Sequence, residues 1–573
     1  MDYEKIGLKI GLEVHQQLNT KKLFCNCSTQ MLEQNLKYEI RRRLRPVVSE
    51  LGKVDRAALF EFFRNREFIY HGYENEACLV DLDEEPPHEI NKEALDIAIA
   101  IALNLGLNIP DELYIMRKLV LDGSAITSFQ RTILIGYGPA DFNGVRIKSL
   151  CLEEDAAKIE SQNKNTTTYS LSRLGVPLIE VGTEPDIRSP EQAKMIAEDL
   201  GLLFRSFNVK RGIGTIRQDV NISIEKGARV EIKGWQDLRA LPKLIENEVL
   251  RQINLLNIRD KIKSIAIKEP VNVSKLFGKN AFALRLPEFM KYASMELCKG
   301  RSFKTELLEY GTFYDSEITS NNSEINKLIK PDKDEMVVVA LGADAEKAIN
   351  AIFQRARYCL IGIPEETRKP NQDATTSYAR PLPGSARMYP ETDLLPLRIS
   401  KVMPKMPETM LSKRKKLEKI LSKDIANQII KSRYYPLFEK IVNRKEKDSK
   451  FVSCIGAMFT SVVKDLKRRG IEIENISDND YIKISEAIEK NRISKRTIPN
   501  ILTEVSKGKD VNSVIKKFEL VGEEELKKII KDVVKKNRDK DISALMGIIM
   551  NKIGGRADGE LVIKELKKMM KDA

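Results

Sequence analysis

Two different spacings of apolar residues divide this chain of 573 residues near residue 400. Before that point, short apolar runs such as KIGLEVHQQL, RTILIGYG and RVEIKGW stand between Gly and Pro turns, as strands do. After it, Leu, Ile and Lys recur at helical spacing, as in KRKKLEKILSKDIANQIIK. The sequence therefore predicts an α+β fold in which a sheet-centred cradle domain is followed by helical domains.

A second α+β pattern interrupts the first part of the chain. FALRLPEF and MVVVALG predict short strands, and ADAEKAINAIFQRAR predicts an amphipathic helix, which together indicate an inserted α+β domain. The Pro- and Gly-rich stretch 364–397 excludes a long helix or a central strand, so we expect a polar loop that lines a site. We place the domains at 1–255 with 360–400 (cradle), 256–359 (insertion), 401–500 (helical) and 501–573 (helical tail).

The net charge of +14 is concentrated at the C-terminal end. Residues 1–400 hold 56 Lys and Arg against 57 Asp and Glu, whereas residues 401–573 hold 41 against 26. Such segregation is typical of polyanion binding, because neutralised phosphates supply most of the non-specific affinity. Lysine-rich helices also serve as solvated faces, and the sequence leaves that alternative open.

Composition also indicates a compartment. No stretch offers the ~20 apolar residues of a membrane span, and the N-terminus lacks the basic start and apolar stretch of a signal peptide. The seven cysteines are odd in number and scattered, which argues against a disulfide framework and for a reducing environment. We expect a cytoplasmic protein without membrane contact.

Two of the cysteines suggest half of a zinc site. Cys25 and Cys27 stand one residue apart, and Cys78 is followed by Asp81 where a CxxC motif has its second thiol. Three thiols and one carboxylate would bind zinc weakly. A structural zinc is therefore doubtful, and we expect reduced core thiols.

Acidic residues stand at or just beyond four apolar runs. Strand ends would aim them into one cleft, where two or three carboxylates suit Mg²⁺, while an imidazole favours Mn²⁺ or a contact through water. Asp and Glu are common in this chain, so solvated loop carboxylates remain the alternative for each run. The groups are Glu13 with His15, Glu153-Glu154-Asp155, Glu180, and Asp219.

The sequence lacks the residues that several common kinds of catalysis require. The chain has three histidines and no HExxH motif, which makes histidine-rich zinc hydrolysis or a His-dependent triad a poor match. It also has no GxxxxGK[ST] motif. If the protein uses ATP, it does so without a P-loop.

Several long motifs follow one another along the first 400 residues. They are IGLKIGLEVHQQL with FCNC, CLEEDAAK, YSLSRLGVPLIEVGTEPDIRSP, GTIRQDVNISI with RVEIKGWQDL, and SARMYPETDLLP. In this order they resemble the tRNA-dependent amidotransferase family that contains the B and E forms. The 256–359 segment looks like the insertion domain of bacterial-type aspartyl-tRNA synthetases, which is typical of the archaeal E form. The tail with GGRADGELV resembles the helical tail shared by both forms.

The resemblance implies a reaction and its cofactors. Glutamate attached to tRNA(Gln) is phosphorylated on its side chain by ATP with Mg²⁺, or Mn²⁺ as the alternative, and ammonia then displaces the phosphate. A glutamate side chain has a pKa of about 4.3, so it needs no strong base to act as the nucleophile. The site must instead align the groups and neutralise charge.

The resemblance also implies the site residues. His15, Glu154 and Glu180 match the family's metal ligands. Glu13, Glu153 and Asp219 match its neighbouring acidic positions. Beside or inside the matched motifs we add three candidates for phosphate contact, for which ordinary loop salt bridges are the alternative: Arg217, Lys233 and Arg387. Tyr169 and Ser170 are candidates for lining the substrate pocket.

The chain has no glycine- and serine-rich amidase motif, so a second protein must supply ammonia. In the E form's family this partner is an asparaginase-like D subunit, and the resemblance implies a hetero-oligomer with two copies of each subunit. The basic helical end is expected to bind tRNA(Gln). Two other hypotheses stay open: a metal-dependent hydrolase or nuclease, and a non-catalytic tRNA-binding scaffold.

Overall fold

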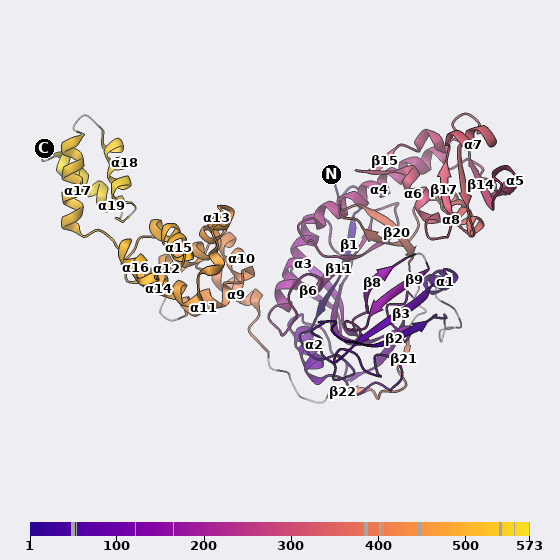
Figure 1. Ribbon diagram of the computed structural model, residues 1–573, viewed down its shortest axis with the longest axis horizontal. Coiled ribbons are helices and arrows are strands. Elements are labelled where there is room, and N and C mark those ends of the chain that lie inside the picture. The colour runs from indigo at the N-terminus through magenta and orange to yellow at the C-terminus, as the bar shows by residue number, and fades with distance from the viewer. Residues whose placement is uncertain are drawn as a thin grey trace. The chain divides into compact units, whose positions relative to one another are not determined.

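The computed structural model describes residues 1–571 apart from 47, 49–51, 53, 55, 121, 164, 383–387, 400–403, 405, 444–448, 538–540, 555 and 558. The chain forms two compact units, Met1–Pro407 and Glu408–Ala573. The first is α+β, and the described part of the second is helical, so the predicted fold class is confirmed (Figure 1). Among the described residues, no helix combines the length and apolar character needed to span a bilayer.

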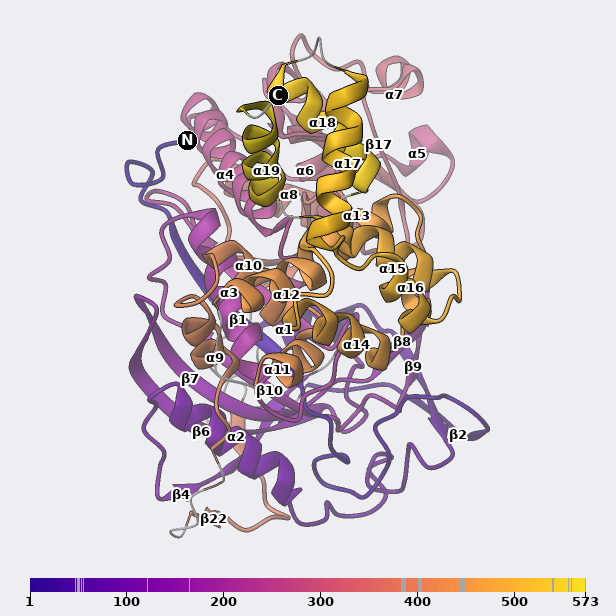
Figure 2. The same cartoon turned by 90° about the vertical axis from the view of Figure 1, so that its left-hand side faces the viewer.

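A ten-stranded sheet forms the centre of the first unit, and its neighbouring strands are antiparallel except for the parallel pair β12 and β19. Strands β6 and β7 are long and curved (Figure 2). Across the sheet the order is β20 (Thr376–Pro381), β19 (Glu366–Pro370), β12 (Val230–Trp235), β11 (Ile216–Ser223), β1 (Lys9–Gln17), β10 (Pro177–Thr183), β7 (Val145–Glu154), β6 (Phe129–Phe142), β5 (Ile115–Leu119) and β21 (Met388–Pro390).

Helices cover one face of this sheet. Helix α3 (Pro190–Phe204) begins at a Ser189 cap with proline in its first turn, and it packs beside α4 (Leu241–Ile262). Its Gly201 lies against Ile216, which shares a sheet face with Val14 because residues two apart on a strand point the same way. The alternate residues Glu13 and His15 therefore project from the other face.

Smaller elements surround the sheet. A four-stranded sheet encloses its own apolar core, which includes Phe68, Tyr70 and Tyr169. Helix α2 (Lys92–Asn104) coincides with the apolar helical pattern of NKEALDIAIAIALNLG. The remaining elements here are β2 (Leu36–Arg42), β3 (Glu67–Tyr73), β9 (Thr166–Ser170), β8 (Lys158–Gln162), α1 (Arg56–Phe63), and the pair β4 (Glu112–Leu113) and β22 (Leu397–Arg398).

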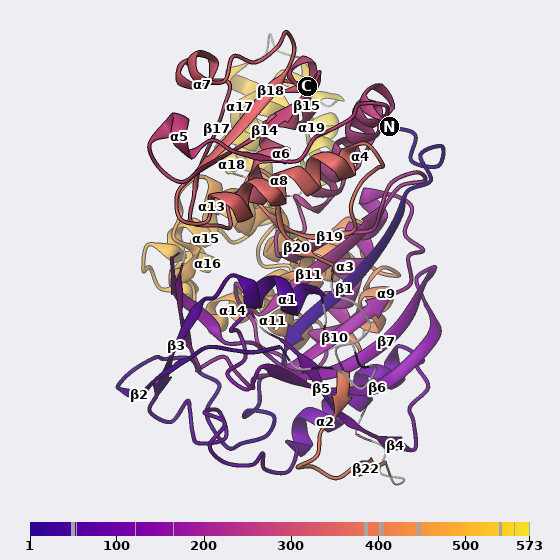
Figure 3. The ribbon, with the colours of Figure 1, turned by 90° about the vertical axis from the view of Figure 1, so that its right-hand side faces the viewer.

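The segment predicted as an insertion has a separate four-stranded sheet, with α8 (Ala345–Cys359) packed beside β14 and β18 (Figure 3). Its core continues into the end of α4 through Leu255 and Ile258. The predicted strands and helix of this segment are confirmed. Its other elements are β13 (Val271–Asn272), β14 (Ala281–Leu286), β18 (Met336–Leu341), β17 (Glu317–Ser320), β15 (Glu296–Cys298), β16 (Arg301–Ser302), α5 (Ser274–Phe277), α6 (Phe303–Leu308) and α7 (Ser323–Leu328).

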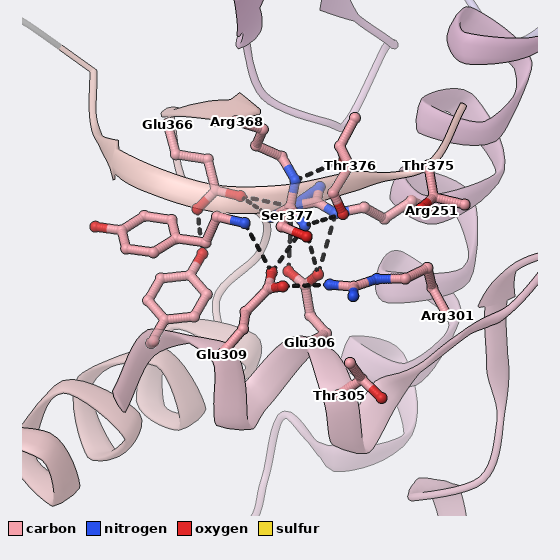
Figure 4. A network of polar contacts seen from close by, with 12 residues as sticks. Arg251, Arg301, Thr305, Glu306, Glu309, Glu366, Arg368, Thr375, Thr376 and Ser377 are labelled. Carbon is pink, nitrogen blue, oxygen red and sulfur yellow. Dashed lines mark hydrogen bonds and ion pairs between the residues drawn. The ribbon is translucent and has the colours of Figure 1, made fainter. Parts of the chain in front are cut away.

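Buried ion pairs join this segment to the main sheet (Figure 4). Arg368 of β19 has a fully buried side chain and contacts Glu306 of α6 at 3.1 Å and Glu309 at 2.8 Å. Arg251 of α4 contacts Glu306 at 3.1 Å and Glu366 at 2.6 Å. Since buried charges persist only when paired, these contacts fix how α6 meets β19.

The stretch 364–397 differs from the expected loop. It contains β19, β20 and β21, and β19 lies inside the sheet, between β20 and β12. Prolines 370, 381 and 390 each end one of these strands. A proline at a strand end removes no hydrogen bond from the middle of a ladder. The prolines of this stretch are therefore compatible with strands, although their number had indicated a loop.

The second unit is helical throughout its described residues. The run KRKKLEKILSKDIANQIIK forms two helices, because Ser422 caps the second one. Helices α17, α18 and α19 pack around a common core (Figure 2). The helices are α9 (Met410–Leu417), α10 (Lys423–Lys431), α11 (Tyr435–Val442), α12 (Ser449–Ala457), α13 (Val463–Arg468), α14 (Asp478–Glu489), α15 (Ile498–Ser506), α16 (Val511–Lys517), α17 (Glu523–Lys536), α18 (Ile542–Ile553) and α19 (Gly559–Lys571).

Candidate active site

Strand pairing brings most of the predicted site residues onto one face of the main sheet. In β1, His15 lies opposite Glu180 of β10 on one side and Arg217 of β11 on the other. Glu13 lies opposite Asp219 of β11. Cross-strand partners share a face, so groups far apart in the sequence meet here.

The first group, which we call the histidine cluster, consists of His15, Glu153 and Glu180. One ligand atom from each lies within 4.8 Å of the others. The His15 Nε2 atom is 3.1 Å from Glu180 Oε2. Burial favours neutral His15, but the Glu180 hydrogen bond together with the charges of Asp219 and Glu180 outweighs burial and raises the pKa of His15. Burial would raise the pKa of Glu180, but Lys118 and His15 hold it well below its usual value.

Glu153 is fixed by residues that no sequence motif had indicated. Lys118 Nζ of β5 lies 2.9 Å from Glu153 Oε1 and 3.6 Å from Glu180 Oε2. Thr132 and Gln130, on β6, donate hydrogen bonds to Glu153 at 2.9 and 3.0 Å. None of the three belongs to an acidic motif, so only the pairing of β5, β6 and β7 reveals them.

The second group, which we call the acidic cluster, consists of Glu13, Asp219 and Glu231. Lys233 Nζ lies 2.8 Å from Asp219 and 3.2 Å from Glu231. Burial, together with Glu180, raises the pKa of Glu13 to about 7. Burial would also raise the pKa of Asp219, but Lys233 and His15 outweigh it and lower that pKa to about 2. The Lys233 ammonium is thus the cation already inside this cluster.

Glu154 does not lie in the histidine cluster. It follows Glu153 on β7, and successive strand residues point to opposite faces. Glu154 accepts a hydrogen bond from the Arg131 backbone N–H at 3.1 Å, and its carboxylate lies 3.4 Å from the Arg131 guanidinium. Arg131 also contacts Glu391 at 2.7 Å. The structure therefore places Glu153, rather than Glu154, beside His15 and Glu180, which corrects the assignment made from the motif.

Arg217 lies beside these clusters, but a carboxylate already engages it. Its guanidinium contacts Asp155 Oδ1 at 2.8 Å, and Gln17 donates to Asp155 Oδ2 at 2.6 Å. Burial would raise the pKa of Asp155, yet Arg217 and Arg173 lower it. Asp155 thus orients Arg217 at the edge of the site.

Tyr169 and Ser170 are not part of either cluster. Both are buried in the small sheet, where Tyr169 stacks on Tyr70 and donates a hydrogen bond to the Asp122 carbonyl. Their role in a substrate pocket stays a prediction. Arg387 lies outside the described residues, so its predicted phosphate contact also stays a prediction.

The histidine cluster fits a divalent cation. It offers two carboxylates and an imidazole, a set that suits Mn²⁺ and, with water as further ligands, Mg²⁺. The Nδ1 atom of His15 is buried and has no hydrogen-bond partner among the described residues. Because Nε2 is the nitrogen that faces Glu180, a cation in this cluster would bind Nε2, and the buried Nδ1 needs a separate partner such as water.

The cysteines near the N-terminus also meet. Cys25, Cys27, Cys78 and Asp81 each offer one ligand atom within 4.8 Å of the others. Asp81 Oδ2 lies 3.8 Å from Cys25 Sγ and 3.7 Å from Cys78 Sγ. Its other oxygen lies 3.1 Å from the buried Lys22 Nζ. Zn–S bonds of about 2.3 Å put tetrahedral ligands about 3.5–3.8 Å apart, so this geometry fits a zinc ion.

Comparison with known proteins identifies the family. A model of the GatB/GatE catalytic domain matches residues 8–405, which include both clusters. The chain belongs to the GatB/GatE family. A second model, described as a GatB domain, matches residues 436–570 of the helical unit. The resemblance argued from the motifs is thereby confirmed.

Relatives within the GatB/GatE family match over the full length. Three proteins named as the E subunit of glutamyl-tRNA(Gln) amidotransferase represent them. The one from Saccharolobus solfataricus is 40% identical over 631 residues, and the one from Archaeoglobus fulgidus is 40% identical over 615; each match covers 100% of this chain and 99% of the relative. The one from Methanocaldococcus jannaschii is 39% identical over 630 residues and covers 100% of both chains.

Proposed function

We propose that this chain is the glutamyl-tRNA(Gln)-modifying subunit of a tRNA-dependent amidotransferase, and that it phosphorylates the glutamate side chain with ATP before amidation. The observation that carries the proposal is the convergence of His15, Glu153 and Glu180 from three neighbouring strands, with Lys118 beside both carboxylates. The full-length similarity to proteins named as the E subunit of such an enzyme supports the substrate.

The proposed chemistry has two steps. A side-chain carboxylate oxygen of the glutamyl-tRNA attacks the γ-phosphorus of ATP, the bond to ADP breaks, and an acyl phosphate forms. Ammonia then attacks the acyl carbon, the C–O bond to phosphate breaks, and the nitrogen loses a proton to give the amide. Ionised carboxylate needs no base, so the protein's task is alignment and charge stabilisation.

Residues of this chain have distinct roles in the proposal. His15, Glu153 and Glu180 would hold Mg²⁺ or Mn²⁺, which when bound neutralises charge on the transferring phosphate. Lys118 and Lys233 supply positive charge at the two clusters. Arg217, oriented by Asp155, would contact a phosphate oxygen.

Ammonia would come from a partner, the asparaginase-like D subunit implied by the family resemblance. A small pocket lies behind the histidine cluster, and Gln130 separates the two by bonding Glu153 and the Glu154 carbonyl. Its lining is mainly apolar, with Ser124, Arg131 and Glu154 among its polar side chains. Acyl phosphates hydrolyse when water reaches them, so delivery through a passage away from bulk water suits this chemistry. We propose this pocket as the last part of the ammonia route.

The second unit would bind the tRNA backbone. Residues 401–573 carry an excess of 15 positive charges, and α17 presents exposed lysines. Contacts of this kind set affinity and salt dependence rather than chemistry. A cytoplasmic hetero-oligomer with two copies of each subunit completes the proposal.

One experiment separates the candidate functions. The full chain is incubated with ATP, Mg²⁺, Glu-tRNA(Gln) and high ammonium, which replaces the partner, and the aminoacyl product is identified by mass spectrometry. The proposal predicts Gln-tRNA(Gln) and ADP only when all components are present. RNA cleavage without ATP would indicate a nuclease instead, and binding without turnover would indicate a scaffold.

A further inference from the structure

We propose that Lys118 is an internal counter-ion that competes with the divalent cation for the histidine cluster and so lowers the cluster's affinity for metal. This inference rests on the proposed function only in its last step, where the displaced ammonium contacts the phosphoryl group. Lys118 stands outside every motif that identified the site. Lys118 acts on the metal site through Glu153 and Glu180, and its effect on metal binding is measurable without turnover.

The acceptor sites of the Glu153 carboxylate limit how many donors or metal ions it can bind. A carboxylate offers about four acceptor sites, two on each oxygen. Oε1 of Glu153 accepts from Lys118 and from Thr132, both at 2.9 Å, and Oε2 accepts from Gln130 at 3.0 Å. One acceptor site is therefore left for a metal ion while Lys118 is in place. Removal of the Lys118 ammonium frees a second acceptor site, on Oε1.

The position of Lys118 carries the second step. Its ammonium also lies 3.6 Å from Glu180 Oε2, the oxygen that contacts His15. The backbone of Lys118 is held on both sides, because it pairs with Gln130 of β6 and with Met388 of β21. The side chain is 13% exposed, so water screens this charge little.

Charge balance carries the third step. Glu153 and Glu180 supply two negative charges, and Lys118 neutralises one of them. A divalent cation on the same oxygens would stand next to the ammonium, and their repulsion is strong where water is scarce. Metal binding therefore expels the ammonium from the carboxylates. A phosphoryl group on the metal offers it new acceptors, which explains a lysine at this place.

The test is Mn²⁺ binding to the full-length protein, followed by electron paramagnetic resonance of the free ion. Lys118→Met keeps the length of the side chain and removes its charge, so we expect Mn²⁺ to bind about ten-fold more tightly, equivalent to ~1.4 kcal/mol. Lys118→Arg keeps the charge and should stay within about three-fold of the wild type. The control is Lys148→Met, which removes an exposed charge on β7 and should change nothing.

Unchanged or weaker Mn²⁺ binding by Lys118→Met would overturn the proposal, because a purely structural lysine would orient the carboxylates and its loss would disorder them. Should that variant fail to fold, judged by circular dichroism, Lys118→Gln replaces it with the same two outcomes. The KM for ATP with Glu-tRNA(Gln) should rise in Lys118→Met. If Mn²⁺ binds more tightly but the wild type consumes no ATP, the proposed function fails while the counter-ion role stands.

Discussion

At the scale of single residues, the alternation of a β-strand decides which glutamate can act. Glu153 and Glu154 are neighbours in sequence, yet one reaches the histidine cluster and the other pairs with Arg131 on the opposite side. The CLEEDAAK motif is compatible with either assignment. The register of β7 against β10 selects Glu153, since Leu178, opposite Glu153, shares a face with Glu180.

Tyr169 gives the first residue-scale prediction. Its ring is buried against Tyr70 and its hydroxyl donates one hydrogen bond to a backbone carbonyl. Tyr169→Phe keeps the ring and loses only that bond, so we expect a stability loss of ~1 kcal/mol and unchanged KM values for ATP and Glu-tRNA(Gln). Steady-state kinetics check this. A several-fold rise in either KM would instead support a role for Tyr169 in the substrate pocket.

At the scale of elements, much of the fold could be predicted, because apolar spacing marks β1, α2, β14 and α8 directly. Elements that depend on tertiary contacts could not be predicted from apolar spacing. Strand β19 is short and ends in proline, and its buried Arg368 depends on Glu306 of α6 and on Glu309 for paired charge. Lys118 was missed for the same reason: its partners come from β7 and β10.

The buried ion pairs give an element-scale prediction. Glu306→Gln removes one carboxylate that faces Arg251, Arg355 and Arg368. Breaking a buried pair leaves unpaired charge and costs roughly 3–5 kcal/mol. Calorimetry should show a melting temperature lower by about 5 °C or more. The control is Glu288→Gln in an exposed pair with Lys291, which should shift it by less than about 1 °C. Equal shifts would contradict the structural role of the network.

The group of Cys25, Cys27, Cys78 and Asp81 gives a second element-scale prediction. It ties the segment around residue 25 to the turn at Cys78, and its four ligand atoms lie within 4.8 Å of one another. Although the sequence favoured reduced core thiols, the geometry leads us to expect about one zinc per chain by elemental analysis of the purified protein. Asp81→Cys should tighten zinc binding and Cys27→Ser should abolish it. Zinc-free protein whose seven cysteines all titrate as free thiols after denaturation would instead support the prediction of reduced core cysteines.

At the scale of the whole molecule, charge and chemistry lie in different units. Both clusters belong to Met1–Pro407, whereas the excess of positive charge belongs to Glu408–Ala573. Composition alone predicted this division. The family assignment also followed from motifs, several of which form the strands that carry the cluster residues. The partner and the identity of the metal are properties of molecules outside the chain, so no residue pattern fixes them.

This division predicts separable effects on RNA binding. Replacing Lys527, Lys528 and Lys531 of α17, which are exposed, with Gln should weaken tRNA binding and reduce its salt dependence. Each lost phosphate contact lowers the slope of log K against log salt by about 0.7–0.9. Filter binding at several salt concentrations measures this. Replacing Lys275, Lys279 and Lys291 of the first unit is the matched control. An unchanged slope in the α17 variant would indicate that these lysines form a solvated face and do not contact tRNA.

The proposed mechanism depends most on one claim, that His15, Glu153 and Glu180 hold a single divalent cation. Titration of Mn²⁺ against Glu153→Gln and Glu154→Gln, with the free ion followed by electron paramagnetic resonance, tests it directly. We expect Glu153→Gln to weaken binding by about 100-fold or more, because it removes a ligand, and Glu154→Gln to stay within about ten-fold of the wild type. Strong binding by Glu153→Gln together with its loss in Glu154→Gln would contradict the claim.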